Sequence, residues 1–77
     1  MAINRSSFFE RLDKSPASFN QVEYAEANRQ GSSAWRVYAV NDFSQHLFID
    51  FEQTKAAAGA AAGRYRRWLE EYNNDRY

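Results

Sequence analysis

The spacing of apolar residues changes once between Trp35 and Tyr72. From Trp35 to Gln53 apolar residues recur at every second position, and from Thr54 onward they recur at spacings of three and four. The first pattern is typical of strands with one buried face, and the second is typical of an amphipathic helix. The sequence therefore predicts two paired strands followed by one long helix that packs across them.

The length of the chain and its composition limit what this fold can do. With 77 residues we expect a single small globular domain over 1–77, whose core draws on six Phe, five Tyr and two Trp residues. The absence of cysteine excludes disulfides and thiolate metal sites, and it favours a reducing, cytoplasmic location. Residues 1–9 lack the apolar run of a signal peptide, and no apolar run is long enough to span a bilayer, so we expect no membrane association.

Both helices are predicted from their boundary signals. Ser7 and Glu10 fit a capping box, which predicts a short helix over about 8–14 that ends before Pro16. Thr54 is a suitable cap for the long helix, over about 54–73. Its glycines, Gly59 and Gly63, predict a close approach of this helix to the sheet. The apolar stripe that should face the sheet consists of Ala58, Ala61, Tyr65, Trp68, Leu69 and Tyr72.

Residues 19–30 are compatible with two structures. They contain good helix formers with Pro16 before them and Gly31 after them, so the alternative fold has a helix over 16–30 beside a two-stranded hairpin. We predict a strand, because a turn at 29–33 aligns cross-strand pairs of matching chemistry. Those pairs are Val22 with Val40, Tyr24 with Tyr38, Glu26 with Arg36, Ala25 with Val37, and Ala27 with Trp35.

The predicted fold is thus α+β, with a three-stranded antiparallel sheet (about 19–28, 34–41 and 46–53) covered on one face by the long helix. Pairing of the second and third strands puts Ala39 with Leu47, Val37 with Ile49 and Trp35 with Phe51 on the inner face, toward the helix. The outer face pairs Tyr38 with Phe48 and Arg36 with Asp50.

This outer face is the predicted partner-binding site. Aromatic side chains beside an arginine are typical of protein-binding hot spots, and exposed apolar patches often mark interaction sites. The N-terminal aromatic residues could instead fold over the same face, and the sequence leaves both arrangements open. The expected contact residues are Tyr24, Tyr38, Phe48, Arg36, Asp50 and Glu26.

No catalytic or metal site is expected. Ser44, His46 and Asp50 cannot form a triad, because four residues along a strand separate His46 and Asp50 by about 13 Å. A single His without Cys leaves only carboxylates for a metal, and Asp42, Asp50 and Glu52 lack ligand spacing. We therefore expect a protein that is not an enzyme, with no catalytic residues and no cofactor.

A basic segment at the middle of the long helix supports an alternative function. The predicted nucleic-acid-binding residues are Lys55, Arg64, Arg66 and Arg67, with Tyr65 and Trp68 interleaved. Against this, Glu70 and Glu71 can pair with Arg66 and Arg67 at i,i+4, and the chain has no net charge. Nucleic acid is therefore the less favoured partner.

The element order resembles that of double-stranded RNA-binding domains. Gly31-Ser-Ser-Ala-Trp35-Arg-Val-Tyr-Ala-Val40 stands where that family has its second strand, and the Ala-rich stretch from Thr54 stands where its last helix begins. Phe51-Glu-Gln-Thr54 is also similar to the corresponding junction in plant-type DNA readers with three strands and a helix. The phosphate-gripping lysine cluster of the first family is reduced here to Lys55. The likeness is one of topology, which says little about function.

Taken together, the sequence predicts a non-catalytic protein-binding module. A small inhibitor, adaptor or immunity-type protein of bacterial or phage origin would have this size and charge. Its expected partner is another protein, and a homodimer is a further alternative.

Overall fold

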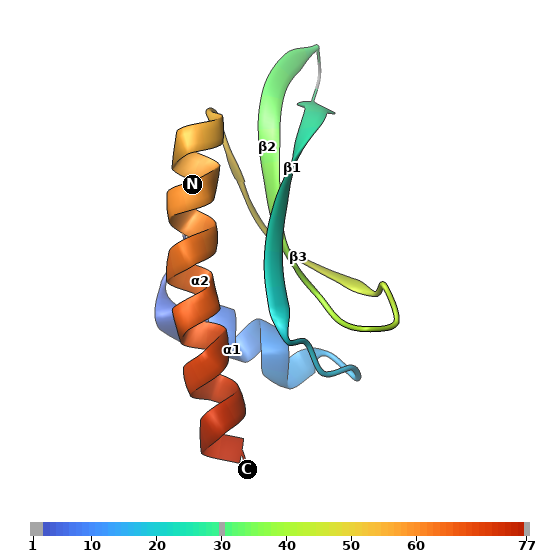
Figure 1. Ribbon diagram of the computed structural model, residues 1–77, viewed down its shortest axis with the longest axis vertical. Coiled ribbons are helices and arrows are strands. Elements are labelled where there is room, and N and C mark those ends of the chain that lie inside the picture. The colour runs from blue at the N-terminus through green and yellow to red at the C-terminus, as the bar shows by residue number, and fades with distance from the viewer. Residues whose placement is uncertain (1–2, 30, 77) are drawn as a thin grey trace.

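The computed structural model describes residues 3–29 and 31–76 and has the predicted α+β architecture. The three strands form one antiparallel sheet with the order β1-β2-β3, and the long helix runs along one face of it (Figure 1). The strand prediction for residues 19–30 is thus confirmed over Gln21–Arg29, and the helical alternative for 16–30 is wrong. In chain order the elements are α1 (Arg5–Lys14), β1 (Gln21–Arg29), β2 (Ser32–Val40), β3 (His46–Glu52) and α2 (Lys55–Arg76).

Helix α1 begins earlier than the capping box predicts. Its N-cap is Asn4, whose side-chain oxygen accepts a hydrogen bond of 2.8 Å from the backbone N–H of Ser7. Asn is as favourable at this position as Ser, so Ser7 lies inside the first turn instead of before it. The helix ends at Lys14, and Ser15 is extended, as expected for the residue before Pro16.

Helix α2 has the predicted cap and the predicted apolar stripe. The Thr54 hydroxyl oxygen accepts a hydrogen bond of 3.1 Å from the N–H of Ala57, which satisfies one donor of the first turn. Trp68 and Tyr72 are only partly buried, at the edge of the core. The buried residues of the stripe are Ala58, Ala61, Tyr65 and Leu69, and Ala62, outside the predicted stripe, is buried as well.

The connection between β1 and β2 is shorter than the predicted turn at 29–33. Strand β1 continues to Arg29 and β2 begins at Ser32, so the connection consists of Gln30, which lies outside the described residues, and Gly31. Gly31 has a φ of 79°, a backbone conformation that glycine adopts without strain and that two-residue hairpin turns require.

The short connection shifts the β1–β2 register by one residue. Tyr24 pairs with Val37 instead of Tyr38, and Glu26 pairs with Trp35 instead of Arg36. A slip of one residue moves every side chain of a strand to the opposite face. The prediction that Tyr24 and Glu26 lie on the outer face is therefore wrong. Val22, Tyr24 and Glu26 lie on the α2 side, and Glu23, Ala25 and Ala27 lie on the outer face.

Strand β3 contains a bulge that the sequence pattern does not reveal. Tyr38 pairs with Phe48 as predicted, but Val37 pairs with Asp50, so Ile49 is an extra residue without a cross-strand partner. An extra residue reverses the alternation of the strand beyond it. Ile49 and Asp50 are consequently both buried on the α2 side.

At the bulge and beyond it, three predicted pairs are wrong. Phe51 pairs with Arg36 on the outer face, and Glu52 pairs with Trp35 on the inner face. The predicted Val37–Ile49, Arg36–Asp50 and Trp35–Phe51 pairs do not form, because all three assume unbroken alternation through Ile49.

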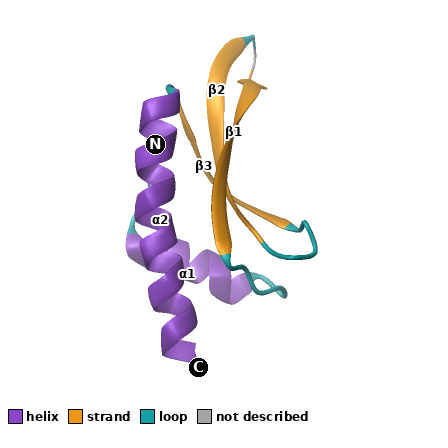
Figure 2. Ribbon diagram, viewed as in Figure 1, coloured by secondary structure: helices purple, strands orange, loops and turns teal. Residues whose placement is uncertain are grey.

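The core lies between the inner face of the sheet and both helices. The ring of Phe8 on α1 packs against Tyr65 and Trp68 of α2, with centroid distances of 5.5 and 6.2 Å. Leu12 and Phe19 belong to the same buried cluster, and α1 crosses behind the lower half of α2 (Figure 2). The N-terminal apolar residues therefore complete the core on the α2 side and do not fold over the outer face.

The two glycines of α2 differ in their surroundings. A methyl group added at Gly59 would meet the Tyr24 hydroxyl at 3.5 Å, which is an ordinary contact, and one added at Gly63 would meet nothing within 4 Å. The predicted close approach thus concerns Gly59 and is wrong for Gly63. Among the described helices, none is long and apolar enough to cross a membrane.

Candidate interaction surfaces

Five side chains from β2 and β3 define the centre of the outer face. Strand β2 contributes Arg36 and Tyr38, and β3 contributes His46, Phe48 and Phe51. We call these five residues the outer-face cluster. They share one side of the sheet because Tyr38 pairs with Phe48, Arg36 pairs with Phe51, and His46 lies two residues from Phe48.

Tyr38 is the scaffold of this cluster. It is only 8% exposed although it lies on the outer face. The ring of His46 stacks on it at 4.5 Å, and the guanidinium of Arg36 lies 5.3 Å from its centroid. Its hydroxyl donates a long hydrogen bond of 3.5 Å to Glu23. Tyr38 thus orders its neighbours, and those neighbours form the accessible surface.

Phe48 and Phe51 supply the apolar part of that surface. Phe48 is 43% exposed, and its ring lies 4.9 Å from that of Phe51, at an interplanar angle of 51°. The bulge at Ile49 makes this contact, because it turns Phe51 to the outer face. Arg36 and His46, both exposed, border the two rings. The cluster combines rings, a cation and an imidazole, which are common features of protein-binding surfaces.

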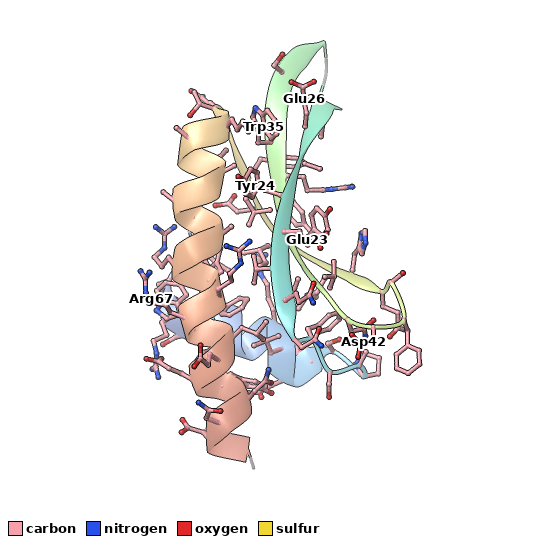
Figure 3. All side chains as sticks on the ribbon, in the orientation of Figure 1. Glu23, Tyr24, Glu26, Trp35, Asp42 and Arg67 are labelled. Atoms are coloured by element: carbon pink, nitrogen blue, oxygen red, sulfur yellow. The ribbon has the colours of Figure 1, made fainter. Side chains whose placement is uncertain are left out.

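Three of the predicted contact residues lie elsewhere. Figure 3 shows Tyr24 and Trp35 between the β1–β2 hairpin and α2, and their ring centroids are 6.1 Å apart. Glu26 lies across from Trp35 on this same side. Asp50 is only 9% exposed, and its Oδ1 accepts a 2.8 Å hydrogen bond from the N–H of Phe51. Of the predicted site, Arg36, Tyr38 and Phe48 remain together.

Sequence reasoning placed Phe51 on the inner face and gave His46, at the start of the predicted third strand, no part in the site. His46 is the first residue of β3, as predicted, and its exposed ring stacks on Tyr38. The run Ile49–Phe51 gives no signal of the bulge, because an acidic residue between two large apolar ones is also the pattern of unbroken alternation.

The arginines of α2 do not form one patch. Arg66 points to the edge of β1, where its guanidinium donates two hydrogen bonds to the carbonyl oxygen of Val22. Arg64 lies over the rings of Tyr65 and Trp68, at 5.0 and 5.8 Å from their centroids. Figure 3 shows Arg67 on the side of α2 that faces away from the sheet. Lys55 is at the other end of the helix, about 14 Å from Arg64 along its axis.

The ion pair predicted between Arg67 and Glu71 is replaced by another. Glu71 forms an ion pair with Arg5 of α1, with an Nε–Oε2 distance of 3.0 Å, instead of pairing with Arg67 within α2. Both side chains of this pair are about half exposed, so its contribution to stability is small. On this side of the helix, Arg67 is exposed, and Arg64, one turn before it, is partly buried.

Each edge of the sheet is met by an arginine from a helix. Arg66 of α2 bonds to Val22 on β1, and Arg11 of α1 donates to the carbonyl oxygens of Phe48 and Ile49 on β3. Side chains that occupy edge carbonyls hinder the addition of further strands. A partner would therefore find more accessible surface on the outer face of the sheet than at its edges.

A polar groove of about 500 Å³ runs between β1 and the second half of α2. Arg66 lies in its wall, with its guanidinium already bonded to Val22. The other polar lining residues are Asn20, Gln21, Glu23, Glu70, Asn73 and Asn74. This mixture of amide and carboxylate side chains does not indicate one class of ligand for the groove. In the described part of the chain, no three His, Asp or Glu side chains gather as metal ligands would.

Comparison with known proteins found no match to any family model, and no curated protein or solved structure is significantly similar to this chain.

Proposed function

We propose that this protein is a non-catalytic protein-binding module that docks a partner protein on the outer face of its sheet. The observation that carries the proposal is the pair of adjacent rings, Phe48 and Phe51, on a face that neither helix covers. In a chain this small, most large apolar residues are needed in the core, so an exposed ring held in place by a neighbouring ring, as Phe48 is by the partly buried Phe51, indicates a role outside folding.

The contact is centred on Phe48 and bordered by Arg36 and His46. Tyr38 holds the cluster together from beneath and has little surface of its own to offer. Ring contacts in a desolvated centre with a polar border match the arrangement in which a few residues supply most of the binding energy. The small size and balanced charge agree with an inhibitor, adaptor or immunity-type protein of bacterial or phage origin, acting in the cytoplasm.

The test uses a matched pair of charge reversals together with one ring substitution. Tagged wild type, Arg36→Glu, Arg67→Glu and Phe48→Lys are each used to capture proteins from host lysate, and the captured proteins are quantified by mass spectrometry. Arg36 and Arg67 are both exposed but lie on different faces. A partner that binds the outer face is lost with Arg36→Glu and with Phe48→Lys, and it is retained with Arg67→Glu. Circular dichroism establishes that each variant is folded.

Capture that survives both Arg36→Glu and Phe48→Lys contradicts the proposal. Loss of capture with Arg67→Glu alone moves the site to α2 instead.

Arg64 and the partly buried Trp68 favour one second candidate, nucleic-acid binding on α2. A guanidinium over Tyr65 and Trp68 beside the exposed Arg67 can contact both bases and phosphates. Only part of the predicted basic set is available for this, because Arg66 is bonded to β1. Retention on immobilised single-stranded DNA at low salt, lost at high salt and with Arg67→Glu, would support this candidate over the outer face.

A further inference from the structure

Trp35 and Tyr24 form a pair of rings on the inner face of the sheet, away from the outer-face cluster. Their centroids are 6.1 Å apart and their planes meet at 58°, so the rings form two adjoining walls. Both are only partly buried, at the margin of the core. Figure 3 shows them beside the first half of α2, below the tip of the β1–β2 hairpin.

The sequence of α2 leaves part of both rings accessible. After Lys55, the next seven residues of the helix are alanine or glycine, so no side chain larger than a methyl group approaches from this part of α2. Gly59 lies near the Tyr24 hydroxyl, which an added methyl group would meet at 3.5 Å. The short side chains therefore leave room for a flat group that approaches the rings beside the helix.

Two carboxylates stand on either side of Trp35. In the sheet, Trp35 pairs with Glu26 of β1 and with Glu52 of β3, so the three side chains project from the same face. Neighbouring strands are about 4.8 Å apart, which places the two glutamates about 10 Å apart with the indole between them. Glu26 is exposed and Glu52 is partly buried. Within residues 3–29 and 31–76, neither carboxylate forms a hydrogen bond or an ion pair.

Other aromatic rings of the chain have a guanidinium over them. The pairs are Arg5 with Phe9 at 4.4 Å, Arg36 with Tyr38 at 5.3 Å, and Arg64 with Trp68 at 5.8 Å from the ring centroid. Among the described residues, no such cation lies over Trp35 or Tyr24. The exposed Lys55, three residues after Glu52, forms no ion pair with it. Two carboxylates against one ammonium leave this part of the surface negative.

We propose that Trp35, Glu26 and Glu52 bind an arginine side chain of a partner protein. The face of an indole attracts cations more strongly than the other aromatic rings do. A guanidinium is flat, so it stacks on the indole, and its N–H donors point to both sides, toward the two carboxylates. The ammonium of a lysine is a compact charge without this shape. The negative charge beside the rings complements that of the bound cation.

This site is separate from the one in the proposed function. It lies on the face of the sheet opposite to Arg36 and Phe48, and it selects a positive group instead of an apolar one. A single side chain buries little surface, so a short peptide should bind in the millimolar range. A whole partner protein would add contacts around the arginine.

Titration with short peptides, followed by NMR, tests the proposal. The chain has two tryptophans, so a proton–nitrogen correlation spectrum shows two indole N–H signals, which Trp68→Phe assigns. A glycine–arginine–glycine peptide with blocked ends should shift the Trp35 signal in a saturable manner. It should leave the Trp68 signal in place, because Arg64 already lies over that ring.

Two further peptides examine the charge and the shape of the ligand. Citrulline has nearly the shape of arginine without its charge, so the citrulline peptide should shift neither indole signal. The lysine peptide has the charge without the planar group, and it should bind about threefold more weakly than the arginine peptide. Binding of the arginine peptide should weaken as the salt concentration rises.

Neutral variants of the glutamates identify the site on the protein. Glu26→Gln and Glu52→Gln should each raise the Kd of the arginine peptide by about threefold, and together by about tenfold. The matched control is Glu23→Gln. Glu23 is also exposed and lies on the same strand as Glu26, but on the outer face, so its substitution should leave the Kd unchanged. Circular dichroism establishes that each variant is folded.

Four results would overturn the proposal. They are the absence of a saturable shift of the Trp35 signal up to about 20 mM peptide, an equal shift with the citrulline peptide, equal binding of the lysine peptide, and an unchanged Kd in the double glutamine variant. None of them bears on capture of a partner through Arg36 and Phe48, so the proposed function is tested separately.

Discussion

The guanidinium of Arg66 bonds twice to the carbonyl oxygen of Val22, with distances of 3.1 Å from Nε and 2.8 Å from Nη2. These residues are 44 positions apart in the chain, and the contact ties the middle of α2 to the edge of β1. Arg66 is therefore an arginine of the basic segment with a structural role. Arg67, the next residue, turns away from the sheet.

We expect Arg66→Ala to lower the free energy of unfolding by about 1–2 kcal/mol, because two charge-assisted hydrogen bonds are lost from a partly buried carbonyl. Arg67→Ala is the matched control, and it should change stability by less than about 0.5 kcal/mol. Urea denaturation followed by circular dichroism measures both values. Equal effects of the two substitutions would show that the bond to Val22 contributes nothing specific.

The open surroundings of Gly63 predict that alanine there stabilises the protein. Gly63→Ala should raise the free energy of unfolding by about 0.5–1 kcal/mol, since the helix gains propensity and the new methyl group meets no neighbour. At Gly59 a larger side chain would run into the Tyr24 ring, so Gly59→Leu should destabilise and Gly63→Leu should not. Thermal melts of the three variants check this. A destabilised Gly63→Ala would contradict the surroundings described for that position.

The difference in burial between Tyr38 and Phe48 separates folding from binding. Tyr38→Ala should cost about 2–4 kcal/mol of stability, because it removes a ring enclosed by His46 and Arg36. Phe48→Ala should cost less than about 1 kcal/mol, because its ring is 43% exposed. Chemical denaturation of each variant gives the comparison. If Phe48→Ala proved the more costly change, Phe48 would be a core residue and a poor candidate for partner contact.

The pKa of Glu10 is lowered by its hydrogen bond with Lys14, at 2.8 Å, and by the charge of that ammonium group. The pair has the favourable i,i+4 order, with the acid toward the helix N-terminus. A lowered carboxyl pKa contributes stability that is present above the unfolded-state pKa and is lost as the pH falls through the folded-state pKa. Side-chain NMR titration should show the Glu10 pKa rising in Lys14→Met. An unchanged value would mean that the ion pair does not persist in solution.

The order and type of the elements were predictable because local signals agree. Thr54 caps α2, Pro16 follows α1, and the spacing of apolar residues changes where the sheet gives way to the helix. Each of these signals depends only on residues that are close together in the sequence, so it can be recognised without knowing the tertiary structure. The prediction missed Asn4 as the cap of α1 because Ser7 offered an equally good pattern.

The candidate site was harder to predict because it depends on register. Matching Tyr24 with Tyr38 favoured a longer turn, whereas Gly31 supports a two-residue connection. The greater bulk of Val22 and Tyr24 over Ala25 and Ala27 was the available signal that the first pair faces the core.

The extra residue in β3 also affects how binding at the outer face should depend on salt concentration. With unbroken alternation, Arg36 would lie opposite the carboxylate of Asp50, and salt would weaken any binding that used this ion pair. With Ile49 inserted, the position opposite Arg36 is a phenyl ring adjoining another. Salt does not screen the attraction between apolar surfaces. Partner binding at this face should therefore persist at salt concentrations that dissociate complexes held by ion pairs alone.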